Sequence, residues 1–193
     1  MTELARDSDS RLCGISVRAV LKLLSPGQVG ALVVLSLVLF LLLAWSRTGL
    51  WPTLALAPLI VALAAIVVLD LAARIIPNVI TFPMLAYALL LAAAHVTVPL
   101  RQAVLGALIG AGLPLIGAII RRGAIGGGDV KLMAVLGAAL GWKGALYVFA
   151  LSHVAGALVL LALVLIQHKF PRGRFPIGAF IALVGAIFIV AGH

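Results

Sequence analysis

The 193-residue sequence is 65% hydrophobic and only 10% charged, whereas soluble domains carry roughly 25% charged residues. This composition excludes an ordinary water-soluble globular protein and indicates an integral membrane protein. The apolar runs are long and continuous, unlike the alternating strands of about ten residues found in membrane barrels. The sequence therefore predicts an all-α, polytopic bundle of transmembrane helices with six to seven spans.

The net charge of +9 comes from 14 Lys and Arg residues that lie between the apolar runs, mostly at their ends. Basic residues in these positions are signals of membrane orientation, so no nucleic-acid partner is expected. One cysteine and four dispersed histidines predict no disulfide framework, no metal site and no cofactor.

In chain order, residues 1–28 are polar and basic and are expected to form a cytoplasmic tail. The membrane-embedded domain is expected at 29–193 and begins with an uncleaved first span at 29–45. A dozen apolar residues from Asp129 to Gly141 form about 18 Å of helix, too short to cross a bilayer comfortably alone. The further full spans are expected at 51–71, 79–98, 103–120, 143–167 and 176–192.

The distribution of basic residues decides whether the short stretch crosses the membrane. If it crosses, seven crossings with a cytoplasmic N-terminus place eleven Lys and Arg inside and three outside. If it does not cross, the split is nine to five. The positive-inside rule favours seven crossings. Small residues at helical spacing predict close helix packing in lipid; they include Gly106, Gly110, Gly137 and Gly141.

Acidic residues are scarce. Three of the five, Glu3, Asp7 and Asp9, lie in the first nine residues, and the remaining chain holds only Asp70 and Asp129. Ionisable side chains at membrane depth are costly and are therefore candidate functional groups. The seven-crossing topology places both aspartates near the cytoplasmic face.

The segment that begins at Asp70 continues through Arg74 to Pro77 and Asn78. Arg74 follows Asp70 by four residues, so a continuous helix would place both on one face, where they can pair. Pro77 is expected to end the span. Asn78 is expected to cap the next helix or to turn the chain into it.

Asp129 follows three glycines, in the order Gly126-Gly127-Gly128-Asp129-Val130-Lys131. Glycines permit backbone conformations and close approaches that a Cβ would forbid. Asp129 is expected at a helix N-terminus, where its side chain can cap the helix and the helix dipole favours its charge.

Two carboxylates brought together perform chemistry that one cannot, because one stays protonated while the other is a base. The base deprotonates water for attack on a peptide carbonyl and the acid protonates that carbonyl, as in aspartic proteases. Ser152 beside His153 lacks the glycines of a nucleophile elbow, so a serine hydrolase is not expected.

Two other functions remain open from the residues alone. A proton- or cation-coupled transporter would use the two aspartates as intramembrane carriers, although transporter sites lie preferentially at the midplane. In a non-catalytic assembly scaffold, the acids would only pair with Arg74 and Lys131.

The two segments together resemble the type IV prepilin peptidases, over about residues 55–192. The resemblance implies a Gly-x-Gly-Asp type of intramembrane aspartyl endopeptidase that removes the leader peptide of prepilin-like precursors. The residues that carry it are Asp70, Arg74, Ile76-Pro77-Asn78, Thr81 and Gly126-x-Gly128-Asp129-x-Lys131-Leu132.

The resemblance makes Asp70 and Asp129 the catalytic pair. It also extends to a Pro-x-Gly element that ends at Gly178, with Ala179 where a proline is often found. The other residues expected to bind substrate or shape the site are Gly126, Gly127, Gly128, Lys131, Arg74, Pro77 and Asn78.

The implied setting is the cytoplasmic (inner) membrane, with a multi-pass chain in the lipid bilayer. The implied substrate carries a short basic leader and a hydrophobic helix, and no oligomeric state follows from the sequence. Larger family members have a cysteine-rich cytoplasmic insert and methylate the new N-terminus. A chain with one cysteine resembles the short Tad/Flp or archaeal preflagellin form, so no methyltransferase activity is expected.

Overall fold

The computed structural model describes residues 25–46, 50–120, 126–167 and 175–192, and these form helices without any strand. Four of the helices are long and apolar enough to span a membrane. The expected all-α membrane bundle is thereby confirmed, while most of the expected tail at 1–28 lies outside the described residues. The helices are α3 (Pro26–Ser46), α4 (Leu50–Ala73), α5 (Asn78–Ala93), α6 (Leu100–Ile120), α7 (Gly127–Gln167) and α8 (Ile177–Ala191).

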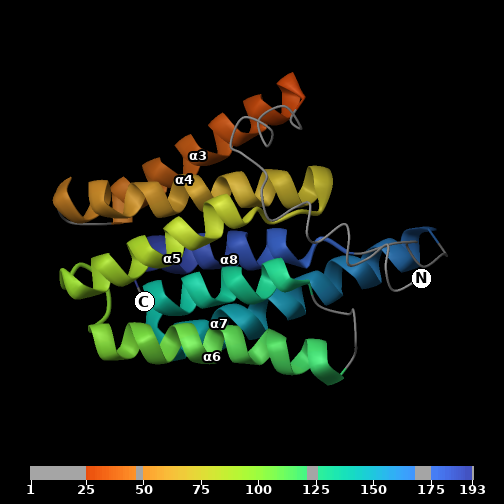
Figure 1. Cartoon of the computed structure of the whole chain (residues 1–193). Coiled ribbons are helices and arrows are strands. Elements are labelled where there is room, and N and C mark those ends of the chain that lie inside the picture. The colour runs from red at the N-terminus through yellow and green to blue at the C-terminus, as the bar shows by residue number, and fades with distance from the viewer. Residues whose placement is uncertain (1–24, 47–49, 121–125, 168–174, 193) are drawn as a thin grey trace.

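Helix α7 consists of two helices joined at Gly141, which has φ 74° and ψ 179°. Glycine adopts this conformation without the steric cost that a Cβ imposes. Figure 1 shows α7 running to one end of the bundle and returning from it. The short helix that the sequence predicts between Asp129 and Gly141 is therefore confirmed.

The direction of the chain alternates from one helix to the next, as Figure 1 shows. The end of α4 and the starts of α5, α7 and α8 consequently lie at one end of the bundle, the right-hand end in that view. This arrangement brings the predicted site residues of distant segments to the same end.

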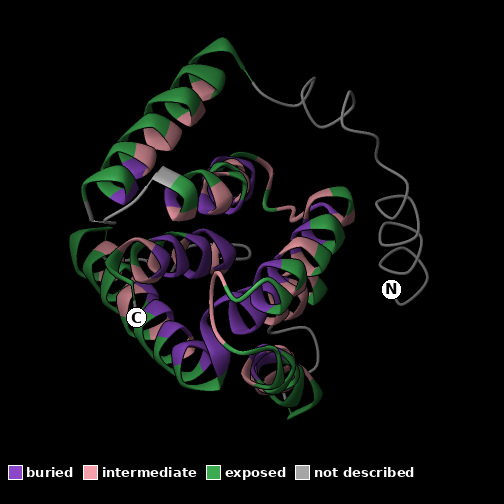
Figure 2. Cartoon of the chain, turned by 90° about the vertical axis from the view of Figure 1, so that its left-hand side faces the viewer, coloured by how far each residue is buried: buried purple, intermediate pink, exposed green. Residues whose placement is uncertain are grey.

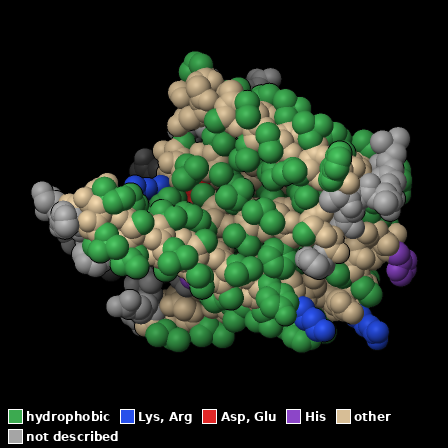
Figure 3. All heavy atoms as spheres, turned by 180° about the vertical axis from the view of Figure 1, so that it is seen from behind, with side chains coloured by type: hydrophobic (Ala, Val, Ile, Leu, Met, Phe, Trp, Pro, Cys, Tyr) green, Lys and Arg blue, Asp and Glu red, His purple; other side chains and the backbone are tan. Residues whose placement is uncertain are grey.

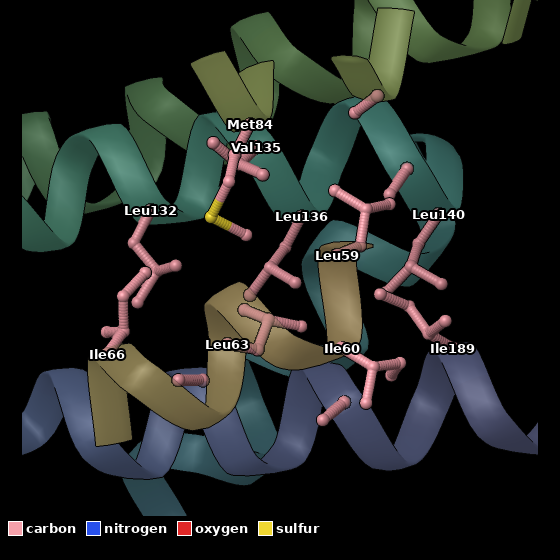
Figure 4. Close-up of a cluster of buried hydrophobic side chains, with 14 of the residues drawn as sticks. Leu59, Ile60, Leu63, Ile66, Met84, Leu132, Val135, Leu136, Leu140 and Ile189 are labelled. Carbon is pink, nitrogen blue, oxygen red and sulfur yellow. The ribbon is translucent and has the colours of Figure 1, made fainter. Parts of the chain in front are cut away.

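The first half of α7 is the centre of the bundle and packs against α5, α6 and α8. Nine of the ten residues from 132 to 141 are buried, and Figure 2 shows the buried faces of the surrounding helices pointing inward. Leucines four residues apart present one face of this helix to the core. Figure 4 shows these leucines among side chains of α4, α5 and α8; the labelled residues are Leu59, Ile60, Leu63, Ile66, Met84, Leu132, Val135, Leu136, Leu140 and Ile189.

Helices α6 and α7 cross at glycines. An added Cβ at Gly106 would collide with the carbonyl oxygen of Gly137, and one at Gly137 would collide with that of Gly106. An added Cβ at Gly110 would likewise collide with the carbonyl oxygen of Met133. The close helix packing predicted from the spacing of small residues is confirmed at these positions, because only glycine allows the backbones to approach so closely.

The outer surface of the bundle is apolar. Large hydrophobic side chains are exposed on every described helix, including Leu41, Leu90, Leu108 and Ile166. Figure 3 shows hydrophobic side chains over most of one face, with the few visible Lys and Arg side chains near its margins. A surface of this kind fits contact with lipid rather than with water.

The crossing of α6 and α7 predicts opposite effects for two substitutions on the same helix. Gly106→Ala should lower the free energy of unfolding by about 1–3 kcal/mol, because its methyl group meets backbone that cannot move aside. Gly112→Ala should be neutral or stabilising, because a Cβ there meets nothing within 4 Å and alanine favours helix. Thermal unfolding in detergent measures both, and equal melting temperatures would contradict the packing described.

Candidate active site

Asp70 lies in the last turn of α4 and is only 5% exposed. Its Oδ2 accepts a hydrogen bond from the backbone N–H of Ala179 at 2.7 Å. Ala179 is the third residue of α8, where backbone N–H groups have no partner within the helix. The carboxylate therefore satisfies a free donor of a helix that begins more than 100 residues later in the sequence.

Asp129 is the third residue of α7, so the predicted position at a helix N-terminus is confirmed. Its Oδ2 accepts a hydrogen bond from the N–H of Gly126 at 3.2 Å. An acidic side chain that reaches back to the residue before the helix forms one half of a capping box. Unlike Asp70, which is held by another helix, Asp129 is thus held partly by the start of its own helix.

The two carboxylates meet at Gly178, in the first turn of α8. An ideal Cβ on Gly178 would lie 3.0 Å from Asp70 Oδ2 and 3.0 Å from Asp129 Oδ1. These two oxygens are consequently within about 6 Å of each other, a distance at which carboxylates influence one another's protonation. The juxtaposition expected from topology is present, and Gly178 provides the space for it.

Ile76, in the segment after Asp70, packs against Gly128 and Gly178. Its Cβ is 2.8 Å from the ideal Cβ of Gly128, and its Cδ1 is 2.6 Å from that of Gly178. A side chain on either glycine would therefore force Ile76 to move. Gly127 is different, because a Cβ there meets nothing within 4 Å.

Arg74 lies just beyond the end of α4, where it adopts φ 56° and donates its N–H to the carbonyl of Asp70 at 3.0 Å. The expectation that it shares a helix face with Asp70 is wrong, because the helix ends at Ala73. Pro77 disfavours helical conformation in the residue before it, so α4 cannot continue directly into α5.

Asn78 is the first residue of α5, and Pro77 occupies the N-cap position without a side-chain cap. The expectation that Asn78 caps this helix is therefore wrong. Its Oδ1 instead accepts a hydrogen bond from Lys131 Nζ at 2.6 Å. This bond is stronger than a hydrogen bond between two neutral groups, because its donor is charged. The Lys131 ammonium also lies 5.4 Å from the centre of the Phe82 ring, within the range of a cation–π contact.

The structure thus brings four of the predicted residues into two contacts, the pair Asp70–Asp129 and the bond Lys131–Asn78. Of the predicted glycines, Gly126 binds Asp129 and Gly128 lies against Ile76. The sequence analysis gave no role in the site to three contributors, namely Ile76, Gly178 and the backbone of Ala179. The only signal for the last two was the Pro-x-Gly start of the last helix. Within residues 25–46, 50–120, 126–167 and 175–192, no group of three or more His, Cys, Asp or Glu could hold a metal ion.

A family model described as the type IV leader peptidase family matches residues 57–161, which include both aspartates. The chain belongs to this family. It is 32% identical over 165 residues to the prepilin leader peptidase/N-methyltransferase of Aeromonas salmonicida, which covers 82% of this chain and 56% of that protein. The proteins of the same name from Pseudomonas putida and Dickeya chrysanthemi are 31% and 37% identical, over 80% and 67% of this chain and 55% and 47% of their own lengths.

The chain spans about half the length of the curated relatives it matches. No solved structure matches it. The site geometry therefore comes from this chain alone, and the family membership rests on sequence.

The Lys131–Asn78 bond predicts a coupled effect on stability. Lys131→Met and Asn78→Ala should each lower the melting temperature, and the double variant should be no worse than the more damaging single variant. A charge-assisted hydrogen bond of this kind predicts a coupling free energy of about 1.5 kcal/mol in a thermal double-mutant cycle.

Lys143→Met is the matched control, because Lys143 is exposed and lies over the Trp142 ring, away from the aspartates. It should change the melting temperature little. Additive effects of Lys131→Met and Asn78→Ala would show that the bond does not link α5 to α7.

Proposed function

We propose that this chain is a membrane aspartyl endopeptidase that removes the leader peptide from prepilin-like precursors. The observation that carries the proposal is the convergence of Asp70 and Asp129 on Gly178, at one end of an apolar bundle. Membership of the type IV leader peptidase family supports the same chemistry. The proposal does not extend to methyl transfer.

The competing functions have less support. A transporter that carries protons or cations would place its acids near the bilayer midplane, whereas Asp70 and Asp129 lie at the ends of their helices. A scaffold would use the acids only for pairing with Arg74 and Lys131. Lys131 instead binds Asn78, and Asp70 binds a backbone N–H.

In the proposed reaction, the two carboxylates share one proton. The ionised carboxylate removes a proton from water, and the resulting hydroxide attacks the scissile carbonyl carbon. The protonated carboxyl group donates its proton to the carbonyl oxygen, which gives a neutral tetrahedral intermediate. The C–N bond then breaks as a proton passes to the leaving amine, so both products are released without a covalent enzyme intermediate.

The proposed substrate has a short basic leader, a glycine before the scissile bond and a hydrophobic helix after it. Its helix would lie in the bilayer beside the apolar surface of the bundle, while the extended cleavage site reaches the aspartates. We place the protein in the cytoplasmic membrane, with its N-terminus and the aspartate pair on the cytoplasmic side. The eleven-to-three distribution of basic residues supports this orientation.

The shared proton predicts that either aspartate alone is inactive. Asp70→Asn and Asp129→Asn should each abolish leader cleavage, and the double variant should be no worse, because groups that act as one unit are not additive. Asparagine keeps the shape and an acceptor oxygen, so the fold should survive. Cleavage of a co-expressed prepilin is followed as a leader-sized loss of mass.

Asp9→Asn is the control for removal of a carboxylate outside the pair, and it should leave cleavage unchanged. Substantial cleavage by a well-expressed Asp70→Asn or Asp129→Asn protein would contradict the aspartyl peptidase proposal. The transporter and the scaffold would then become the leading candidates.

The proposed orientation predicts how two exposed arginines react when replaced by cysteine in a Cys13→Ser background. Arg101→Cys, at the end of the bundle opposite to the aspartates, should react with an impermeant thiol reagent in intact cells. Arg74→Cys should react only after the membrane is opened. The reverse pattern would show that the orientation is inverted.

A further inference from the structure

The Ile76 side chain lies where the three segments that form the site meet. Ile76 belongs to the connection between α4 and α5, six residues after Asp70, and is partly buried. Its Cδ1 is 2.6 Å from the ideal Cβ of Gly178 in α8 and 3.4 Å from that of Gly128 in α7. A single methyl group therefore lies between the first turns of these two helices.

Each of the two glycines is joined closely to one carboxylate. Asp129 follows Gly128 in the chain, and the N–H of Ala179, which follows Gly178, is bound to Asp70. A change in the distance between the two glycines is consequently passed on to the distance between the two carboxylates. The ideal Cβ of Gly178 is also 3.0 Å from Asp70 Oδ2 and from Asp129 Oδ1, so the methyl group lies beside both oxygens.

We propose that Ile76 is a positioning residue that sets the separation of Asp70 and Asp129. The reach of its side chain from Cβ to Cδ1 fixes the gap between the starts of α7 and α8, and this gap holds the carboxylates at the distance at which they share a proton. The inference rests on the proposed peptidase function and adds to it a residue that acts on the reaction through the pair. An apolar side chain is suited to this role because close-packed interiors transmit a change of one methylene to their surroundings.

The contacts depend on the reach of the side chain and not on its branching. The atoms nearest to the ideal Cβ of Gly128 are Cβ, Cγ1 and Cδ1 of Ile76, and the atom nearest to that of Gly178 is Cδ1. Leucine has an equivalent of each of these atoms. Valine keeps the branch at Cβ, and with it the backbone preference of isoleucine, but it has no δ carbon. Ile76→Val thus shortens the spacer, whereas Ile76→Leu retains its length.

The experiment measures kcat and KM separately for cleavage of a prepilin by the full chain in detergent. Ile76→Val should lower kcat about tenfold with KM unchanged, because a 1 Å misplacement of reacting groups costs about 10²-fold and the loss of one methyl group allows a smaller shift. Ile76→Leu should keep kcat within about threefold of the wild-type value, because a swap that conserves volume is well tolerated.

Ile80→Val is the matched control for the loss of one methyl group. Ile80 is also partly buried against the core, and none of its atoms is among those nearest to an added Cβ on Gly128 or Gly178. Its kcat and KM should stay at the wild-type values. Thermal unfolding measures the folded fraction of each variant, so that kcat is compared per folded molecule.

Equal kcat values for Ile76→Val and Ile76→Leu would overturn the proposal. A higher KM with kcat unchanged in Ile76→Val would also overturn it, because Ile76 would then act by binding substrate. If Ile76→Val is misfolded, two unbranched residues introduced at position 76 by cell-free synthesis give the same comparison, since norvaline has a δ carbon and α-aminobutyrate lacks one. The norvaline protein should be about tenfold faster, and equal rates would overturn the proposal.

Failure of the peptidase function itself would look different. A wild-type chain that cleaves no prepilin, or an active Asp70→Asn variant, would overturn that function and not only the role of Ile76.

Discussion

The hydrogen bond between Asp70 and the N–H of Ala179 satisfies two buried polar groups, a carboxylate and a helix N-terminus. A buried carboxylate is costly without a partner, and so is a buried helix terminus with free N–H groups. When each satisfies the other, the end of α4 is fixed against the start of α8. Gly178, next to Ala179, then lies beside the carboxylate, and Asp129 approaches the same glycine from α7.

The approach of Asp129 depends on how the first half of α7 is accommodated. This helix is too short to span a bilayer easily, yet it lies in the centre of the bundle because glycines allow α6 to pack directly on its backbone. Gly141 then reverses the chain, so that both ends of α7 return to the end of the bundle where Asp70 lies. Packing that contributes no chemistry thus determines where the second carboxylate lies.

The sequence predicts what depends on side-chain composition and regular spacing. Hydropathy gives the helices, the scarcity of acids identifies Asp70 and Asp129, and the short stretch before Gly141 is recognised by its length. The first helix begins at Pro26, three residues before the expected start of the span, which is the usual uncertainty of a helix boundary. These features are local or follow from the membrane as solvent, so one sequence is enough to find them.

The features that the sequence does not predict depend on where helices end and on contacts between segments that are distant in the chain. The rule for residues four apart fails at Arg74 because the helix ends one residue earlier. Asn78 is engaged by Lys131, 53 residues away, instead of capping its own helix. Gly178 and Ala179 contribute an absent side chain and a peptide N–H. Composition and helical spacing identify neither contribution, and only the Pro-x-Gly pattern marks the place.

The two sides of the aspartate pair differ in how closely they are packed, and this difference bears on how a substrate reaches it. On the side of Asp70, the carboxylate is buried and Ile76 fills the space against Gly178 and Gly128. On the side of Asp129, the carboxylate is partly exposed, and Gly127 next to the helix start has no neighbour within 4 Å of an added Cβ. Among the described residues, the α7 side of the pair is therefore the more open one, and the proposed substrate would reach the carboxylates from that side.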